Sequence, residues 1–324
     1  MRNGRADLSL ENTSAPTHRP LRRQFGQRQR LVKMARAQGE QPFGIGKPGR
    51  KIGGLGGDIA QFLRIGPEIE EQRRQPGEVD IFEIGVAQDG EVAGSRGQAE
   101  MRLRRSARDI AEIERWLKKP DPIVLAIGTG RTLKAAVDQL PALDCPQHRV
   151  VSLTGNIGPD GSAAYYNVVF SMADAIKARH FPMPLPVLVS SAEERELLHQ
   201  QALVRSTLAL GAQADVTFVG VGELGPDAPL CVDGFLAADE MQTLIAAGAA
   251  GEICGWIFDG QGRLLNDPVN ERVASVPIPS RETSVVIGIA MGKRKARAIA
   301  GALKGGLLNG LITDEATAEF LLNV

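Results

Sequence analysis

Ser284-Val-Val-Ile-Gly-Ile-Ala290, followed after Met291 by Gly292-Lys-Arg-Lys-Ala-Arg-Ala-Ile-Ala-Gly-Ala-Leu-Lys304, is the stretch of this sequence that decides the fold. The first part is a strand-like apolar run, and the second has the pattern of a helix that opens on a glycine. A helix start offers unpaired backbone N–H groups and the positive end of the helix dipole, which together favour an anion. We therefore expect a strand, a helix and an anion site where they meet, with Lys295 in the first helical turn.

The same alternation runs through the chain from about residue 107. Apolar runs predict strands at Ile123–Ile127, Arg149–Leu153, Pro186–Val189, Val216–Val221, Ile253–Phe258, Ser284–Ala290 and Leu311–Ile312. Helical patterns occur at Ala107–Lys118, Leu133–Leu140, Asn167–Arg179, Glu193–Ala209, Asp239–Ala247, Lys293–Lys304 and Asp314–Leu322. Strands that alternate with helices indicate an α/β fold, with a mostly parallel sheet covered on both faces. In such sheets ligands bind beyond the carboxyl ends of the strands.

The composition is that of an aliphatic globular protein. Of the 324 residues, 43% are hydrophobic and only 4% aromatic, which favours α/β packing over an aromatic-rich β architecture. The cysteines Cys145, Cys231 and Cys254 are far apart and lack the C-x-x-C spacing of a zinc site. The sequence shows no apolar run of about 18 residues and no signal-peptide pattern. We therefore expect no transmembrane helix, a reduced environment and a cytoplasmic location.

Residues 1 to about 104 have a different character. The net charge of the whole chain is zero, but the first 40 residues are rich in arginine, and residues 41–100 hold 13 glycines. Each interior glycine costs a helix about 1 kcal/mol. Only Gln29–Arg36 and Asp58–Arg64 have helical patterns. We expect a poorly ordered N-terminal third (1–104) with short local helices at most, followed by a globular domain (105–324).

A glycine-rich turn follows the first predicted strand of the globular domain. Its glycines, Gly128 and Gly130, allow backbone N–H groups to approach an anion closely. Thr129 and Thr132 can donate hydroxyl hydrogen bonds, and Arg131 can pair with a phosphate in a bidentate manner. The spacing is neither that of a P-loop nor G-x-G-x-x-G, so a tight strand-to-helix turn is an equally good interpretation.

Other strand ends carry further candidates. Glycines also follow the strands at Leu153–Gly158 and Val219–Glu223, as a cleft that needs close backbone approach would require. Glu252 stands at the start of a predicted strand, where it either accepts sugar hydroxyls or is a solvated residue. The four histidines show neither metal-ligand spacing nor a nucleophile partner. Metal or cofactor chemistry is therefore not predicted.

Taken in order, these segments resemble the sugar-binding effector domain of SorC/DeoR-type bacterial transcriptional regulators. The resemblance covers about two-thirds of the chain. It rests on Ile127–Leu133, Val151–Gly155, Ala214–Gly222, Gly251–Asp259, Ala290–Asn309 and Leu311–Ala318.

The resemblance implies a Rossmann-like fold, similar to the sugar-phosphate isomerases and deaminases, that binds a phosphorylated sugar or related metabolite without turning it over. It also implies operator DNA as a partner and a homo-oligomer, commonly a tetramer. In the family the phosphate lies against the Gly-Arg-Thr turn and the lysine of the last long helix, and the acidic residue of the G-[DE]-I-x-G motif contacts ligand hydroxyls. Carried over, the ligand-binding residues are Gly128, Thr129, Gly130, Arg131, Thr132, Gly155, Asn156, Asn167, Glu252 and Lys295.

The chain departs from the family pattern in two places. The family usually has two glycines at the position of Gly155-Asn156, and Ala-Gly-Gly where this chain has Ala290-Met291-Gly292. Family members also begin with a winged helix-turn-helix, of which only Arg28–Arg36 resembles the first helix. Our hypothesis is that residues from about 37 to 104 are read in a shifted frame, which resequencing the gene tests; the alternative is a truncated member with an unrelated leader. The sequence as written does not predict specific DNA binding.

Two functions compete. The first is a regulator whose effector domain binds a phosphosugar and thereby controls DNA binding. The second is an isomerase-like or deaminase-like enzyme, which needs a base within reach of a carbon-bound proton. Only Glu252 and Asp259 lie near the predicted strand ends as candidate bases, and no histidine accompanies them. The sequence therefore favours a regulator without catalytic residues.

Overall fold

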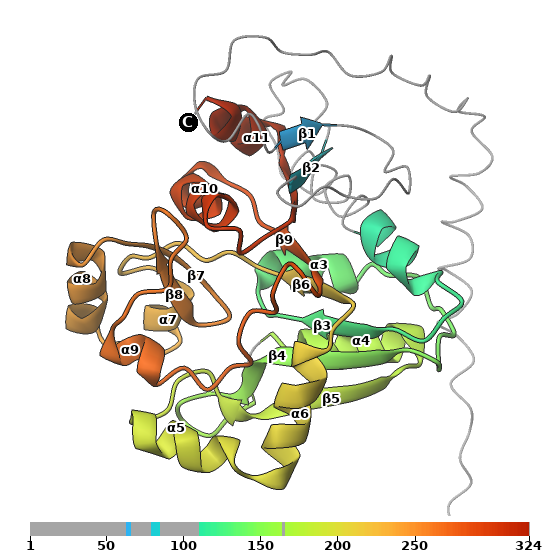
Figure 1. Ribbon diagram of the computed structural model, residues 1–324, viewed down its shortest axis with the longest axis horizontal. Coiled ribbons are helices and arrows are strands. Elements are labelled where there is room, and N and C mark those ends of the chain that lie inside the picture. Colours follow the sequence, from blue (N-terminus) through green and yellow to red (C-terminus); the bar gives the residue numbers. More distant parts are fainter. Residues whose placement is uncertain (1–62, 66–78, 85–109, 164–165, 324) are drawn as a thin grey trace, which may run out of the picture. The chain divides into compact units, whose positions relative to one another are not determined.

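The computed structural model describes residues 63–65, 79–84, 110–163 and 166–323 (Figure 1). The chain divides into two compact units, Met1–Pro48 and Gly49–Val324, and all described residues lie in the second. The predicted helix at Gln29–Arg36, the low order of most of the N-terminal third and the frame hypothesis lie outside the described residues. The boundary at residue 105 stays a prediction.

Eight of the described strands build one parallel sheet, in the order β1-β2-β10-β9-β6-β3-β4-β5. The strand bounds are β1 Leu63–Ile65, β2 Val79–Ile84, β3 Val124–Ile127, β4 Arg149–Ile157, β5 Arg179–Pro186, β6 Val216–Val219, β9 Val285–Ile289 and β10 Gly310–Asp314. The predicted α/β fold with a parallel sheet is confirmed.

Helices cover both faces of this sheet. Their bounds are residues 110–117, α3 Arg131–Val137, α4 Val168–Ile176, α5 Ala192–His199, α6 Ala202–Ala212, α10 Ala296–Lys304 and α11 Glu315–Leu322. Alternate residues of β3 point to opposite faces, as the twofold repeat of a strand requires. Leu125 and Ile127 pack with α3, α4 and residues 110–117, whereas Val124 and Ala126 pack in a cluster with α6 and α10. Both faces of β3 are therefore dry, which explains its continuous apolar sequence.

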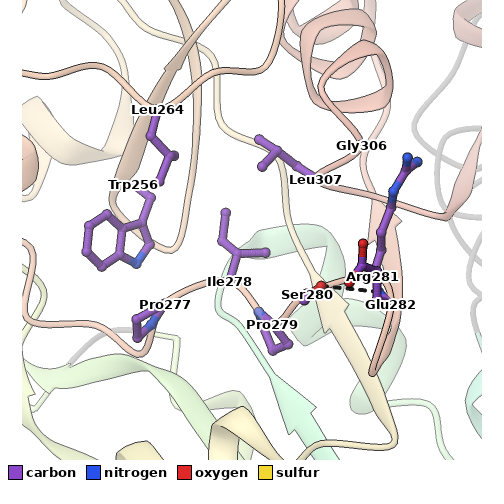
Figure 2. Close-up of a pocket in the computed structure, with 10 residues that line it drawn as sticks. All are labelled: Trp256, Leu264, Pro277, Ile278, Pro279, Ser280, Arg281, Glu282, Gly306 and Leu307. Atoms are coloured by element: carbon purple, nitrogen blue, oxygen red, sulfur yellow. Dashed lines mark hydrogen bonds between the residues drawn. The ribbon is translucent and has the colours of Figure 1, made fainter.

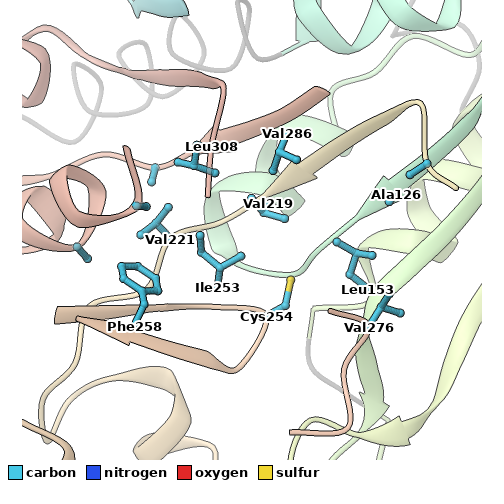
Figure 3. Packing of buried hydrophobic residues seen from close by; sticks show 14 of the residues in the cluster. Ala126, Leu153, Val219, Val221, Ile253, Cys254, Phe258, Val276, Val286 and Leu308 are labelled. Carbon is cyan, nitrogen blue, oxygen red and sulfur yellow. The ribbon is translucent and has the colours of Figure 1, made fainter. Parts of the chain in front are cut away.

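The cluster that contains Val124 and Ala126 reaches beyond the sheet. Figure 3 shows Val219 and Val221, at the end of β6, beside Ile253, Cys254 and Phe258 of the hairpin β7–β8. This hairpin, β7 Ala249–Ile253 and β8 Trp256–Asp259, belongs to a smaller lobe with the short helices α7 Pro229–Val232, α8 Ala238–Ala246 and α9 Pro268–Glu271. The lobe lies beside the carboxyl end of β6 (Figure 1) and supplies one wall of the site described below.

Several expected elements were wrong in detail. The predicted strand at Ile253–Phe258 is an antiparallel hairpin, because Cys254 (φ 54°) and Gly255 (φ 88°) form a two-residue turn of the kind that joins twisted strands. The predicted strand at Pro186–Val189 follows the true strand β5, whose three prolines mask it in the sequence. β5 is the edge strand of the sheet, where proline is tolerated because one side needs no ladder hydrogen bonds.

Two further corrections concern single segments. The predicted helix at Glu193–Ala209 is two helices, α5 and α6, separated at Gln200-Gln201. Leu63 and Arg64 were expected in a helix, and the N-terminal third was expected to form short helices at most. Instead β1 and β2 are strands, and β2 pairs in parallel with β10. Pairing with a preformed sheet edge outweighs local propensity in such short segments.

Candidate functional site

The candidate site is a cleft at the point where the strand order of the sheet reverses. From β3 the chain proceeds outward to β4 and β5 on one side, and later fills β6, β9 and β10 on the other. Loops that follow β3 and β6 therefore diverge and leave a crevice beyond the carboxyl ends of these strands. A cleft of about 270 Å3 lies there, with Lys295 at its side, and its lining includes residues 129–133 and 220–223 together with Glu252, Cys254 and Gly255.

The glycine-rich turn after β3 forms one wall of this cleft. Gly128 is buried and donates its N–H to the carbonyl oxygen of Phe218 on β6 (2.8 Å), which ties the turn to the neighbouring strand. Gly130 has φ 132° and is the residue before helix α3, whose first turn has no side-chain cap. The Thr129 hydroxyl donates to the carbonyl oxygen of Tyr166 (3.0 Å), and Arg131 is exposed. Thr132 lines the cleft on the same turn.

Lys295 enters the cleft from the start of the last long helix. A single 3-10 turn, Lys293–Lys295, precedes α10, so the expected position of Lys295 at the helix start is found in this form. Its Nζ donates to the carbonyl oxygen of Val221 (2.9 Å) and lies 3.7 Å from Oε2 of Glu223. The Lys295 side chain is 26% exposed, and the Val221 carbonyl oxygen holds its ammonium group at the cleft wall.

Glu252 lines the cleft from the hairpin of the smaller lobe. Its Oε2 accepts a hydrogen bond from the N–H of Gly255 (2.8 Å), so the tight turn fixes the carboxyl group. Burial raises the pKa of Glu252 above its ordinary value, and the nearby Glu223 raises it further. The Gly255 N–H and Lys295 act in the opposite direction, but burial is the largest influence.

This raised pKa has a consequence for stability. The folded protein holds the Glu252 proton to higher pH than the unfolded chain does. The resulting contribution of Glu252 to the free energy of unfolding is complete below about pH 4.3, and it is lost as the pH rises through the folded-state pKa. We expect Glu252→Gln to remove this loss, because the amide stays neutral and can still accept from Gly255. Melting curves of both proteins from pH 4.5 to 8 test this, with the exposed Glu282→Gln as control. Parallel curves for wild type and Glu252→Gln would contradict it.

The structure brings most, but not all, of the predicted ligand-binding residues together. Thr129, Gly130, Arg131, Thr132, Glu252 and Lys295 line the cleft, and Gly128 lies directly beneath it. Three residues do not line it. Asn156 donates from its side chain to the carbonyl oxygen of Met183 (3.2 Å), and Gly155 faces the backbone of Leu185 and Pro186 on β5. Asn167 is the residue before helix α4, and its buried Oδ1 has no hydrogen-bond partner among the described residues.

A second hollow, of about 320 Å3, lies elsewhere on the surface (Figure 2). Its walls are largely apolar and include Trp256, Leu264, Ile278 and Leu307. Arg281 is a cation at its rim, but none of the predicted ligand-binding residues contributes. The cleft at the strand-order reversal is therefore the better candidate for an anionic, hydroxylated ligand.

Comparison with known proteins shows the family. Residues 85–323 match the family model described as "Putative sugar-binding domain". The erythritol catabolism regulatory protein EryD of Brucella abortus is 30% identical over 243 residues, which are 75% of this chain and 76% of that protein. The chain belongs to the SorC/DeoR family of sugar-binding transcriptional regulators. This confirms the resemblance that the sequence motifs indicated.

Other family members agree with this assignment. The transcriptional regulator LsrR of Enterobacter sp. (strain 638) is 31% identical over 204 residues, and the chain covers 61% of its length. Two solved structures share the fold at 25% identity. The probable sor operon regulator of Shigella flexneri has a TM-score of 0.63 over 75% of this chain and 93% of that chain. The full-length sorbitol operon regulator SorC of Klebsiella pneumoniae has a TM-score of 0.60 over 71% and 74%, respectively.

The relatives also bear on the competing functions. All those named here are transcriptional regulators, which favours a regulator for this SorC/DeoR-family chain. Within the described residues, no His, Cys, Asp and Glu side chains group as a metal site would require. Likewise, no helix in the described part is long and apolar enough to cross a membrane.

Sequence reasoning missed several residues of the cleft. The sequence analysis named Glu223 only as the end of a glycine-rich segment and Met291 only in a departure from the family pattern, yet both line the cleft. Thr154, inside β4, and Tyr166, before α4, line it too. Glu223 and Met291 lie in the loops that follow the parallel strands β6 and β9, and that position is the signal that could have identified them. Asp233 and Phe235 come from the smaller lobe, which the strand pattern did not reveal.

Cys254 lines the cleft, but we expect its thiol to be unreactive. Burial raises the pKa of its thiol to about 12, so at pH 8 only about one molecule in ten thousand carries the thiolate. We expect iodoacetamide at pH 8 to leave Cys254 and the buried Cys145 unmodified in the folded protein, while the half-buried Cys231 reacts slowly. Peptide mass spectrometry measures this, with denatured protein as control for all three. Rapid labelling of folded Cys254 would contradict the described environment.

Proposed function

We propose that residues 105–324 form the effector domain of a ligand-responsive transcriptional regulator, and that its ligand is a phosphorylated sugar or sugar alcohol. The observation that carries this is the convergence of Arg131, Thr132, Lys295 and Glu252 on one cleft. The cations and hydroxyl suit a phosphate group. The carboxyl group suits sugar hydroxyls.

The lining of the cleft suits a ligand that has both polar groups and apolar surface. Pockets of this kind bind ligands through a few placed polar groups between apolar walls. Here Leu133, Val187, Leu230 and Ile289 provide apolar surface. The cleft volume of about 270 Å3 is small, which favours a compact metabolite. The name of the relative EryD points in the same direction, since erythritol is a four-carbon polyol.

A thermal-shift screen tests the proposed ligand class. Erythritol 4-phosphate, ribose 5-phosphate, glucose 6-phosphate and their unphosphorylated forms are added to the purified chain. We expect at least one phosphate ester to raise the melting temperature, since a ligand that binds only the folded state stabilises it. The matching unphosphorylated compound should shift it far less. No shift with any phosphate ester would count against the proposed function.

Arg131→Ala examines the glycine-rich turn separately. Arg131 is exposed, and within the described residues its side chain makes no hydrogen bond or ion pair, so its loss should leave the melting temperature of the free protein within about 1 °C. We expect the affinity for the best phosphate ester to fall about tenfold, as for the loss of a charge-assisted hydrogen bond. Calorimetric titration measures this, with the exposed Arg263→Ala as control. An unchanged affinity would exclude Arg131 from the phosphate contact.

Ligand binding would act on transcription through the affinity for DNA. A ligand shifts a protein toward the arrangement that it binds more tightly, and this coupling is reciprocal. We propose a homo-oligomer, a tetramer by family resemblance, as the state in which this occurs. An electrophoretic mobility shift with operator DNA, with and without the best ligand, tests the coupling. The alternative enzyme would instead show turnover of hexose or pentose phosphates.

A further inference from the structure

Glu223 occupies an unusual position in the cleft. It lies in the loop after β6, four positions beyond Val219, and its side chain is 15% exposed. Its Oε2 is buried and has no hydrogen-bond partner among the described residues. The nearest cations are Lys295 Nζ, 3.7 Å from Oε2, and the Arg294 guanidinium, 3.8 Å from Oε1. Both distances are too long for a hydrogen bond.

A buried carboxylate oxygen without a donor is costly, and native proteins rarely leave one unexplained. Lys295 does not satisfy it, because its Nζ donates to the carbonyl oxygen of Val221 instead. The unsatisfied carboxylate oxygen of Glu223 therefore indicates a ligand that brings a hydroxyl group into the cleft.

Glu223 also acts on anions that enter the cleft. A phosphate that approaches Lys295 comes close to the Glu223 carboxylate, because the two side chains are only 3.7 Å apart. Like charges at such distances repel each other, and in a partly buried cleft the repulsion is stronger than in water. Sulfate, which carries no proton at neutral pH, therefore meets this repulsion without compensation, whereas a sugar phosphate can offset it with a hydroxyl donor. Repulsion of the wrong ligand is a common source of specificity.

We propose that Glu223 is a specificity-determining residue of the cleft, which accepts a hydrogen bond from a ligand hydroxyl group and disfavours anions that carry none. This inference rests on the proposed function and narrows it. The ligand is then a polyhydroxy phosphate ester with a hydroxyl group near its phosphate, and an anion without a hydroxyl group, such as sulfate, is rejected.

Calorimetric titration of two variants tests this. Glu223→Met removes the acceptor and the charge at similar size, and Glu223→Gln keeps a weaker, neutral acceptor. The probes are sulfate, which has no hydroxyl donor, and whichever of erythritol 4-phosphate, ribose 5-phosphate or glucose 6-phosphate binds the wild type most tightly. We expect the sugar phosphate to bind about tenfold or more weakly to Glu223→Met, with Glu223→Gln in between. Sulfate should bind both variants as tightly as the wild type, or more tightly.

The matched control is Asp227→Asn. Asp227 lies 3.7 Å from the same Arg294 but is 78% exposed and does not line the cleft. The Asp227→Asn protein should therefore bind both probes with the affinity of the wild type. Equal weakening of both probes by the Glu223 variants would show a merely structural role and overturn the inference. An unchanged sugar-phosphate affinity would also overturn it. Failure of every sugar phosphate to bind the wild type is a separate result, and it removes the proposed function on which the inference rests.

Should Glu223→Met fail to fold, as its melting curve would show, the comparison is made with Glu223→Gln and Glu223→Asp. Glu223→Asp keeps the charge but shortens the side chain, so the repulsion of sulfate remains while the hydroxyl contact is lost. We expect it to weaken sugar-phosphate binding without tightening sulfate binding. Affinities for both probes equal to those of the wild type would overturn the inference.

Discussion

Replacing Lys295 with methionine is expected to weaken the binding of a sugar phosphate by about 10- to 100-fold. A hydrogen bond to a charged group contributes about 1.5–3 kcal/mol, and each 1.4 kcal/mol is a factor of ten in affinity. Lys295 already lies at the cleft wall, where it contacts the carbonyl oxygen of Val221. A ligand phosphate therefore gains the ammonium with little rearrangement. Methionine keeps most of the aliphatic stem, so the fold around α10 should be preserved.

The measurement is a calorimetric titration with the sugar phosphate that binds the wild type most tightly. The control is Lys304→Met, because Lys304 is exposed at the other end of the same helix. It should bind the ligand as the wild type does. Equal affinities for wild type and Lys295→Met would remove Lys295 from the phosphate site.

Gly155→Ala is expected to destabilise the free protein by about 3 kcal/mol, as for severe overpacking of a core. A Cβ atom at Gly155 would lie only 2.2 Å from the carbonyl oxygen of Leu185 and 2.5 Å from the carbonyl carbon of Pro186. These are backbone atoms of the β4–β5 segment, so they cannot move aside as a side chain would. The strands must separate locally or the pairing must be lost.

Thermal unfolding measures this effect, and a loss of this size corresponds to a melting temperature lower by roughly 6–12 °C. The matched control is Gly260→Ala, since no atom lies within 4 Å of a Cβ placed there. It should change stability by no more than about 0.5 kcal/mol. The sequence had assigned Gly155 to the ligand site by resemblance. A stable Gly155→Ala protein that fails to bind ligand would favour that assignment over the packing role described here.

The sequence predicted those strands that are buried on both faces. β3, β6 and β9 are short aliphatic runs, and burial alone accounts for their composition. β5 was misplaced because its prolines suit an edge strand, and no local pattern tells an edge strand from a loop. The β7–β8 hairpin was missed because its turn uses Cys254 at positive φ, where Asn or Asp is the usual signal.

The walls of the candidate site were predicted in part. The turn after β3 and the start of α10 each carry a local anion-binding pattern, so Arg131 and Lys295 could be named from the sequence. Glu223 could not, because its importance depends on the distance to Lys295, which lies 72 positions later in the chain. That contact exists only because β6 and β9 are neighbours in the sheet, and the strand order is not written in any local pattern.

A crystal structure of the chain with its tightest-binding sugar phosphate tests the central claim most directly. We predict that the phosphate lies in the cleft beyond β3 and β6, with one oxygen within hydrogen-bond distance of Lys295 Nζ and others facing the turn at Gly130–Thr132. The ligand hydroxyls should face Glu252. A phosphate bound elsewhere, for example beside Arg281 in the hollow near Trp256 (Figure 2), would contradict this account.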